Sequence, residues 1–418
     1  MINFIYGISG SGKSAEVRDG IVADVAAGRR VWLIVPEQQT YTVERRFTAL
    51  LPPSAQLSFE VVNFTRLADI ARRRFGGLTY NYADGGTKSL LMWRTLREVA
   101  PLLEEYDEVA ANDSRAVALS DLMLRTISEL KAAGFRPQSL ERAAEKLERD
   151  SSLGRRMRDI ALVWASYANL LSAGFDDAAD DLTHLTELLE SHDLFADRSV
   201  YIDSFTSYTG QEYRIIDYIM KQAPSLVVTV GCEMPGSTRV HFASIAQAEA
   251  RLRRMADARG GYSVRCLGVP RRFAAPELAV IERCLWDSAA APSADEPDAC
   301  TDSETCVNHE ACLDSEPRVN TEVRAAPEAR LGTDARGGDD SVKDFPPVEI
   351  ACAPTPYAEA QWAASRICEA LRAGMRYRDI AVIARDATRW NGIIDATFDK
   401  YRIPYFISEH TELDSKPI

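Results

Sequence analysis

The most informative chemical pattern in this 418-residue chain is a glycine-rich loop close to its start. Gly7 is followed at the fifth position by Gly12 and then by Lys13 and Ser14, the full spacing of a phosphate-binding loop. Glycines let successive N–H groups turn toward phosphate oxygens, and a helix starting at the loop adds the positive end of its dipole. The pattern predicts an ATP site, against the alternative of a flexible glycine-serine turn. Its predicted residues are Gly7, Ser9, Gly10, Ser11, Gly12, Lys13 and Ser14.

Magnesium bound with ATP would need Ser14 and a second, acidic ligand at the end of a strand. Asp203 follows an apolar run and is the predicted partner, although a simple turn after a strand is the alternative. A hydrolysing helicase motor usually has a glutamate next, whereas Ser204 stands here and Glu212 is the only nearby carboxylate that could replace it. Gly231 is followed by Cys-Glu rather than by the Asp and Gln of a motor. We therefore expect nucleotide binding with impaired hydrolysis.

Polar and aromatic residues follow two further predicted strands. Gln38 and Thr40 come after one, and Phe64 and Arg66 come after the next. Ligands bind at the carboxyl edge of open α/β sheets, so these side chains are candidates for contacts with single-stranded DNA. Each one alone is more often a solvated surface residue or a helix cap. The arginine run at 72–74 adds local positive charge.

The positioning elements are predicted from hydrophobic patterns. Apolar runs at 2–6, 30–36, 57–63, 199–203 and 225–231 predict strands, and helices are expected to begin after the glycine loop and near Thr65. Residues 85–197 carry helical periodicity. This order predicts an α/β domain with an all-helical insertion. The predicted divisions are 1–84 with 198–286 for the α/β domain, 85–197 for the insertion, 287–345 for an acidic linker and 346–418 for a second α/β domain.

The segment from Asp287 to Asp344, which makes up nearly all of the predicted linker, is acidic and has no aromatic residue. Between Asp287 and Asp344 there are fifteen acidic and five basic residues, so the segment carries −10 of the net charge of −13 and the rest carries −3. Such composition predicts disorder, and the remaining charge does not exclude a DNA-binding surface. Beyond it, strands are predicted at 348–352, 380–384 and 404–407, with helices at 357–373 and 387–401. The second domain then stops short of a full sheet, so we expect the chain to be a fragment.

The cysteines do not predict a disulfide framework. Five of the eight are scattered, and a cytoplasmic protein would keep them reduced. Cys300, Cys306 and Cys312, with His309 among them, lack a CxxC pair, so a metal site there is not favoured. The chain has no apolar run long enough for a membrane span and no secretory signal, and we expect a cytoplasmic location.

Taken in order, these motifs resemble the AddB family, the second subunits of bacterial AddAB helicase–nucleases. The resemblance covers nearly all of the chain except the acidic segment. It rests on the phosphate loop, Val-Pro-Glu-Gln at 35–38, Asn-Phe-Thr-Arg at 63–66, Tyr-Ile-Asp-Ser-Phe at 201–205, Tyr-Arg-Asp-Ile-Ala-Val at 377–382 and Ile-Pro-Tyr-Phe-Ile at 403–407.

The resemblance implies a RecA-like superfamily 1 helicase-like fold with a degenerate motor and the start of a second RecA-like domain. It implies an AddA-type partner, single- and double-stranded DNA as ligands, resection of double-strand breaks and recognition of Chi. The DNA-facing residues that it implies are Gln38, Thr40, Phe64, Arg66, Phe205 and Tyr208. The family also carries a RecB-type nuclease domain held by cysteines around a 4Fe–4S cluster, and none of the cysteines here matches that framework.

Two other functions stay open at this point. A P-loop small-molecule kinase would need a lid and an acceptor pocket, and a scaffold would retain only a vestigial loop. The large helical insertion and the ordered helicase-like motifs argue against the kinase, whereas the nucleotide affinity of a Lys13→Ala variant would distinguish the scaffold from a working loop.

Overall fold

The computed structural model describes residues 1–77, 81–148, 151–268, 272–273, 275–284 and 348–406. The chain divides into two compact units, Met1–Ala274 and Ala275–Ile418, and each is described here by itself. The predicted disorder of 287–345 and the cluster Cys300, Cys306, Cys312 and His309 lie outside the described residues. Within the described ranges, none of the helices combines the length and the apolar content needed to cross a bilayer.

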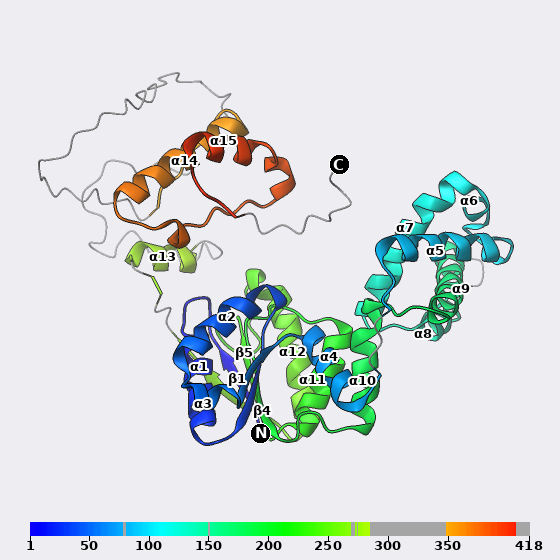
Figure 1. Cartoon of the computed structure of the whole chain (residues 1–418), viewed down its shortest axis with the longest axis horizontal. Helices are drawn as coiled ribbons and strands as arrows, with labels where there is room; N and C mark the ends of the chain where they lie inside the picture. Colours follow the sequence, from blue (N-terminus) through cyan, green and yellow to red (C-terminus); the bar gives the residue numbers. More distant parts are fainter. Residues whose placement is uncertain (78–80, 149–150, 269–271, 274, 285–347, 407–418) are drawn as a thin grey trace, which may run out of the picture. The chain divides into compact units, whose positions relative to one another are not determined.

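A parallel sheet of six strands forms the centre of the first unit (Figure 1). Its order is β3-β2-β4-β5-β1-β6. The strands are β1 (Ile2–Tyr6), β2 (Arg30–Ile34), β3 (Phe59–Val62), β4 (Arg198–Ile202), β5 (Ser225–Val230) and β6 (Ser263–Cys266). The α/β class is therefore confirmed, and five strands lie where the hydrophobic runs predict them. The sixth, β6, is an exposed edge strand whose residues carry no apolar run.

Helices cover both faces of the sheet because side chains alternate along each strand. On one face, Ile5 and Tyr201 pack with the helices α1 (Lys13–Ala26) and α2 (Glu37–Leu50), beyond which lies the short α3 (Pro53–Gln56). On the other face, Phe4 and Val228 pack with a larger group of helices. That group is α4 (Phe64–Phe75), α10 (Asp181–Ser191), α11 (Gly210–Gln222) and α12 (Ala243–Asp257). Burial on both faces explains why the strands read as continuous apolar runs.

The helical region has a hydrophobic core of its own, in which Met92, Met123 and Trp164 are buried. Its helices are α5 (Gly85–Val99), α6 (Asp107–Ala111), α7 (Asp113–Ala132), α8 (Pro137–Ala144) and α9 (Ser152–Ser172). The predicted insertion, 85–197, also includes α10, and there the structure differs. Leu185 and Leu189 of α10 are buried in the core of the α/β domain, so the helical region with its own core ends before α10.

Two chain segments join the helical region to the α/β domain, and they pair with each other. Tyr82 and Asp176 form a parallel bridge, in which Ala83 N donates to Asp176 O and Asp176 N donates to Asn81 O, both at 3.0 Å. We call this pair of segments, 81–83 and 174–181, the neck. These two backbone hydrogen bonds hold the two crossings together at the neck.

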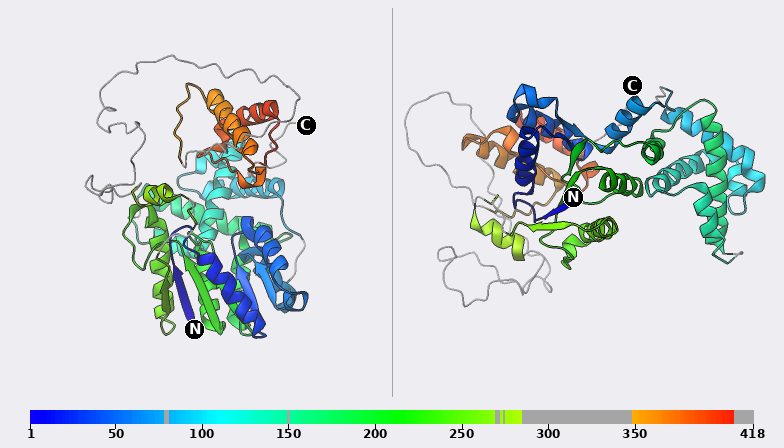
Figure 2. Two further views of the ribbon diagram at one scale, coloured as in Figure 1. Left: turned by 90° about the vertical axis from the view of Figure 1, so that its left-hand side faces the viewer. Right: turned by 90° about the horizontal axis from the view of Figure 1, so that it is seen from below.

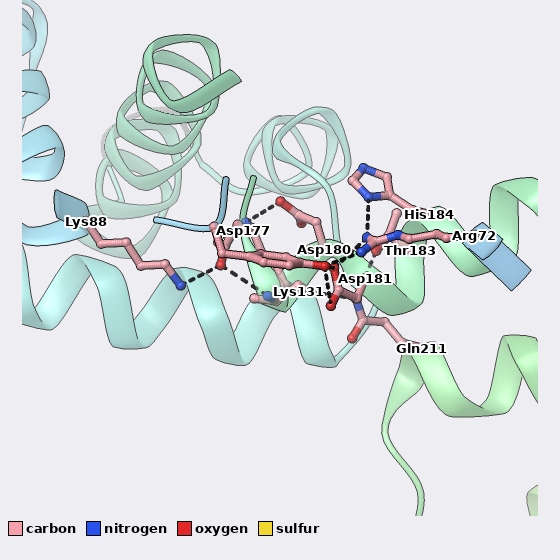
Figure 3. Close-up of polar contacts among 11 residues, drawn as sticks. Arg72, Lys88, Lys131, Asp177, Asp180, Asp181, Thr183, His184 and Gln211 are labelled. Carbon is pink, nitrogen blue, oxygen red and sulfur yellow. Dashed lines mark hydrogen bonds and ion pairs between the residues drawn. The ribbon is translucent and has the colours of Figure 1, made fainter. Parts of the chain in front are cut away.

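A buried ion-pair network fastens the neck (Figure 3). Arg72 of α4 is only 4% exposed, and its Nη2 donates to Asp181 Oδ1 at 2.5 Å. The same guanidinium contacts the Tyr82 hydroxyl and lies 3.2 Å from Nδ1 of His184. Arg72 is the first residue of the arginine run at 72–74, and only Arg73 and Arg74 of that run are exposed and can add positive charge to the surface.

The second half of the network is centred on Asp177. Lys88 and Lys131 each donate to one of its carboxylate oxygens at 2.7 Å, and Lys131 also reaches Asp180 at 2.8 Å. Burial by itself raises the pKa of Asp177, but the two lysine contacts outweigh it and lower the pKa to about 2. The lysines come from α5 and α7, so the network ties two helices of the helical region to the neck.

The second unit is smaller and contains helices but no strand in its described part. The helices α13 (Pro276–Cys284), α14 (Pro356–Arg372) and α15 (Ile393–Tyr401) are accompanied by single turns at Tyr377–Asp379 and Ala387–Trp390. Ile367 and Phe398 form its small core with Ala364 and Ile403. The predicted strands at 348–352 and 380–384 are wrong, and 404–406 is not a strand either. None of these segments pairs with another strand among the described residues, and a strand exists only as part of a ladder.

Substitution of Arg72 tests the neck. Arg72→Ala leaves the Asp181 carboxylate buried without its cation, so we expect a loss of about 3–5 kcal/mol in the free energy of unfolding. Urea denaturation followed by circular dichroism measures it. The matched control is Arg94→Ala, which removes one partner of the exposed Arg94–Glu98 pair and should cost less than about 1 kcal/mol. Equal losses in the two variants would show that the neck pair does not fasten the domain.

The pH dependence of stability tests Asp177. Its pKa is depressed in the folded protein, so its contribution is present above pH 3.8 and is lost as the pH falls toward about 2. The contribution corresponds to roughly 2 kcal/mol. Asp177→Asn should therefore be less stable than the wild type near pH 6, and the difference should shrink as the pH falls from 4 to 2. Asp19→Asn, at an exposed residue, is the control. A difference that stays constant over this range contradicts the assignment.

Candidate nucleotide site and sheet edge

The phosphate loop lies between β1 and α1 in a tight conformation. Gly7 N donates to Val230 O at 3.3 Å, so the loop starts as a continuation of the pairing between β1 and β5. Gly10 and Gly12 have φ of 83° and 100°, values that side chains rarely allow. α1 starts at Lys13 without a side-chain cap, which leaves the first N–H groups of the helix available to an anion. The residues present therefore fit a phosphate group.

Two further observations support that fit. A Cβ atom added at Gly7 would collide with Oγ of Ser11, so the loop closes tightly around this serine. Ser11 Oγ is itself buried and has no hydrogen-bond partner in the described part of the chain. A buried hydroxyl without a partner costs free energy unless a ligand or water satisfies it. Ser9 and Ser14 are exposed on the same loop.

Lys13 folds back across the loop. Its Nζ donates to the carbonyl oxygens of Gly7 and Ile8 at 2.6 and 3.0 Å. Burial lowers the pKa of Lys13, and the attraction of Asp203 opposes that shift. The ammonium group is thus bonded within the loop, and it interacts electrostatically with an acidic residue that follows another strand.

Asp203 directly follows β4 and is 7% exposed. Its N–H donates to Ile34 O at 3.0 Å, and its Oδ1 accepts the Thr229 hydroxyl at 2.6 Å. Ser204, the next residue, has a φ of 68°, which places a non-glycine residue in the left-handed region. The carboxylate is therefore held at the carboxyl edge of the sheet, where Ser14 and Asp203 are the predicted ligands of magnesium.

Glu212 does not occupy the place of a catalytic base. Its Oε2 accepts the Thr209 N–H at 2.7 Å, and Glu212 N donates to the Thr209 hydroxyl at 3.2 Å, so the two residues form a capping box at the start of α11. Burial raises the pKa of Glu212, and the contacts with Thr209 oppose that shift. The carboxylate is committed to the helix start, so a glutamate here is explained by helix capping.

The predicted DNA-facing residues divide into exposed and packed ones. Gln38 is exposed at the start of α2, and Thr40, two residues further on, is half-buried. Arg66 is part-exposed and ion-paired to Glu60, with Nη2 to Oε1 at 2.9 Å. Phe64 is only 3% exposed, and its ring packs in the core, which does not fit the prediction that it stacks on bases.

Phe205 and Tyr208 lie between these extremes. Both are half-buried, their rings stack with centroids 5.1 Å apart, and Phe205 also meets Phe64 edge to face at 5.6 Å. Burial raises the pKa of the Tyr208 hydroxyl. Phe64, Phe205 and Tyr208 therefore form a row of contacting rings that begins in the core. Phe205 and Tyr208 are the two of these residues that keep some exposed surface.

Three residues of this region escape sequence analysis. Thr229 binds Asp203, as described above. A Cβ atom on Gly10 would meet Cβ of the exposed Arg272 at 2.9 Å, so this arginine lies on the phosphate loop. Tyr6, the residue before the loop, donates to the buried Glu249 of α12 at 2.7 Å. No motif marks these residues, although the position of Thr229 at the end of an apolar strand is a general signal for a functional edge.

Within the described ranges, no three His, Cys, Asp or Glu side chains gather into a group that could hold a metal ion. The five described cysteines are free: Cys232, Cys266, Cys284, Cys352 and Cys368. Burial raises the pKa of the Cys232 thiol to about 11, which makes it a packing residue rather than a nucleophile.

Comparison with known proteins identifies the family. A family model described as ADDB, N-terminal, matches residues 4–282. Proteins named as subunits of an ATP-dependent helicase/deoxyribonuclease are similar to the chain over its whole length. Those of Acetivibrio thermocellus and Ruminiclostridium cellulolyticum are 26% and 25% identical, each matched over 100% of this chain and 33% of the relative. The one of Clostridioides difficile is 25% identical with the same coverage.

The chain spans about a third of the length of these curated relatives. The family model matches the region of this chain that contains most of the motifs found in its sequence. The chain belongs to the AddB family, and it corresponds to the N-terminal region of that family.

Proposed function

We propose that the chain is the ATP-binding and DNA-guiding region of an AddB-type subunit. In this proposal it works in the cytoplasm with an AddA-type partner in a helicase–nuclease that resects double-strand breaks for recombinational repair and reads Chi. The observation that carries the nucleotide part is the tight glycine loop, which ends at the uncapped start of α1 and contains the buried Ser11 hydroxyl, a group without a partner among the described residues. The relatives are named as subunits, which supports a multi-subunit assembly.

A RecA-like assignment is supported by the strand order. The phosphate loop follows β1 and Asp203 follows β4, with β5 between these two strands. In a parallel sheet, all carboxyl ends lie on one edge, which brings the loop and the carboxylate to the same side. The nuclease activity, the 4Fe–4S cluster and the second RecA-like domain of the family are proposed for the whole protein, of which this chain covers a part.

The residues of the loop have distinct tasks in this proposal. The N–H groups at the start of α1 bind phosphate oxygens, and Lys13 leaves the carbonyl oxygens of Gly7 and Ile8 to bind a phosphate instead. Ser14 and Asp203 hold the Mg²⁺ that accompanies ATP. Bound Mg²⁺ supplies neutralisation of phosphate charge.

Hydrolysis is proposed to be weak. A carboxylate that orients water is expected next to Asp203, but Ser204 stands there. Glu212 cannot replace it while its carboxylate is bonded to Thr209. ATP then acts mainly as a bound ligand of this region, and unwinding is assigned to the AddA-type partner.

The proposed path of the single strand runs over the carboxyl edge of the sheet. Gln38, Thr40 and Arg66 supply polar and charged contacts, and the exposed parts of Phe205 and Tyr208 supply ring surface. Phe64 supports Phe205 from the core rather than contacting DNA itself. A basic run plays a smaller part than the sequence predicts, since Arg72 is used in the neck.

Lys13→Ala tests the nucleotide site. Loss of the charged contacts to phosphate should weaken binding of a fluorescent ATP analogue about 10- to 100-fold. Fluorescence titration measures the dissociation constant, and thermal melting checks the fold. Lys221→Ala, at an exposed lysine of α11, is the matched control and should bind as the wild type does.

The affinity of Lys13→Ala and an assay for phosphoryl transfer distinguish the competing functions. Unchanged affinity in Lys13→Ala would support a scaffold with a vestigial loop. Phosphorylation of a small acceptor by the wild-type chain would support a kinase. Either result would overturn the proposed nucleotide role in an AddB-type subunit.

Arg66→Ala tests the DNA path. The variant should bind a labelled oligothymidylate more weakly, with the slope of log affinity against log salt reduced by about 0.7, the value for one phosphate contact on a single strand. Nucleotide affinity should stay the same. Fluorescence anisotropy over a series of salt concentrations gives both quantities.

The ion pair between Arg66 and Glu60 provides a second test of the DNA path. Glu60→Gln removes the anion that competes for the guanidinium, so DNA binding should be kept or strengthened. Arg94→Ala, which also removes an exposed arginine paired to a glutamate, is the control. A salt slope that Arg66→Ala leaves unchanged would remove Arg66 from the path, and a joint loss of ATP and DNA binding would indicate misfolding.

A further inference from the structure

We propose that Thr229 is a positioning residue for Asp203, whose hydroxyl holds one oxygen of the carboxylate so that the other stays directed to magnesium at the phosphate loop. The inference rests on the proposed nucleotide function and assigns a residue that no motif marks. Thr229 is not a ligand in this proposal, because it acts through Asp203.

The hydroxyl of Thr229 both donates and accepts a hydrogen bond. Thr229 is 4% exposed, and its Oγ1 donates to Asp203 Oδ1 at 2.6 Å while it accepts the Ser204 N–H at 3.3 Å. A hydroxyl has one proton to donate. Because the proton goes to the carboxylate, both the orientation of the hydroxyl and the acceptor oxygen of Asp203 are determined by these two contacts.

The sheet register places Thr229 where it can do this. β5 pairs with β4 through Ile202 and Val228, so that Asp203 and Thr229 are the next residues along. On its other side β5 pairs with β1 through Ile5 and Thr229. One strand therefore lies between the loop and the carboxylate, and Thr229 is the residue of that strand that touches Asp203.

The backbone at Asp203 needs this support. Ser204 has a φ of 68°, a conformation that costs free energy in a residue other than glycine. The N–H of Ser204 is bonded to the Thr229 hydroxyl, and the N–H of Asp203 is bonded to Ile34 O. The turn after β4 is thus held from both neighbouring strands, and with it the direction of the Asp203 side chain.

The second oxygen of Asp203 is left for a ligand. Among the described residues, Oδ2 of Asp203 accepts no hydrogen bond, although the residue is 7% exposed. Lys13 of the loop lies within its electrostatic reach. A carboxylate held through one oxygen and open at the other is the arrangement of a metal ligand with a supporting partner, and removing such partners costs about 10- to 100-fold in metal affinity.

The test compares Thr229→Val with Thr229→Ser. Valine keeps the shape and removes the hydroxyl, whereas serine keeps the hydroxyl. The affinity for a fluorescent ATP analogue is measured over a magnesium titration and again in EDTA. Mg²⁺ should increase the affinity for the ATP analogue, and the Mg²⁺ concentration that gives half of this increase is the measured quantity. We expect this concentration to be about 10-fold higher in Thr229→Val than in the wild type. Binding in EDTA should change little, and Thr229→Ser should restore the wild-type magnesium dependence.

Two controls separate positioning from a general loss of stability. Thr95→Val removes another buried threonine hydroxyl, bonded to Leu91 O at 2.8 Å in the helical region, and should leave the magnesium dependence unchanged. In an Asp203→Asn background, Thr229→Val should have no further effect on the magnesium requirement. If thermal melting shows that Thr229→Val does not fold, Thr229→Ala replaces it as the variant without a hydroxyl.

The outcomes are distinct. A folded variant without the hydroxyl that keeps the magnesium dependence of the wild type overturns the inference and leaves the nucleotide function standing. An additive effect in the Asp203→Asn background also overturns it, because Thr229 would then act elsewhere. If the wild-type chain binds no nucleotide, with or without magnesium, both the proposed function and this inference are wrong.

Discussion

The parallel pairing of β5 with both β1 and β4 is the constraint on which the candidate site depends. β1 delivers the phosphate loop and β4 delivers Asp203, and β5 sets the spacing between them. Parallel strands are joined by crossovers rather than by tight turns, and the phosphate loop at residues 7–14 is therefore far in sequence from Asp203. A shift of β5 by one residue would turn Thr229 to the other face and remove the contact that holds the carboxylate.

The long crossover between β3 and β4 contains the helical region. The neck restricts the movement of this region relative to the sheet. Two chain crossings with exposed backbone would allow the helical region to swing, but here they pair with each other and are fastened by Arg72 and Lys131. Buried ion pairs add less to stability than they cost to desolvate unless their geometry is good. Their use at the neck fits a role in defining orientation, since Arg72 comes from the α/β domain and Lys131 from the helical region (Figure 3). Figure 2 shows the helical region as a separate group of helices within the first unit.

Several residues that have functional chemistry are used for structure instead. Phe64 begins α4 and is buried because the first turn of an amphipathic helix inserts into the core. Glu212 forms a capping box with Thr209 at the start of α11. Arg72 lies on the buried face of the same helix whose Arg73 and Arg74 face water. The type of a residue determines what it can do, but its face on the helix determines whether it meets a ligand.

Local spacing and apolar runs are enough to predict the α/β class, five of the six strands and the glycine-rich turn between β1 and α1, because apolar runs reflect burial on both faces of the sheet. The order of the motifs along the chain indicates the family. The sequence by itself could not determine that β6 forms, that α10 belongs to the sheet core, or that the segments at 348–352 and 380–384 lack a ladder. Those outcomes depend on which segments become neighbours. The same reason explains Thr229: its hydroxyl gains a role only because the tertiary structure brings β4 alongside β5, a contact that no spacing along the chain encodes.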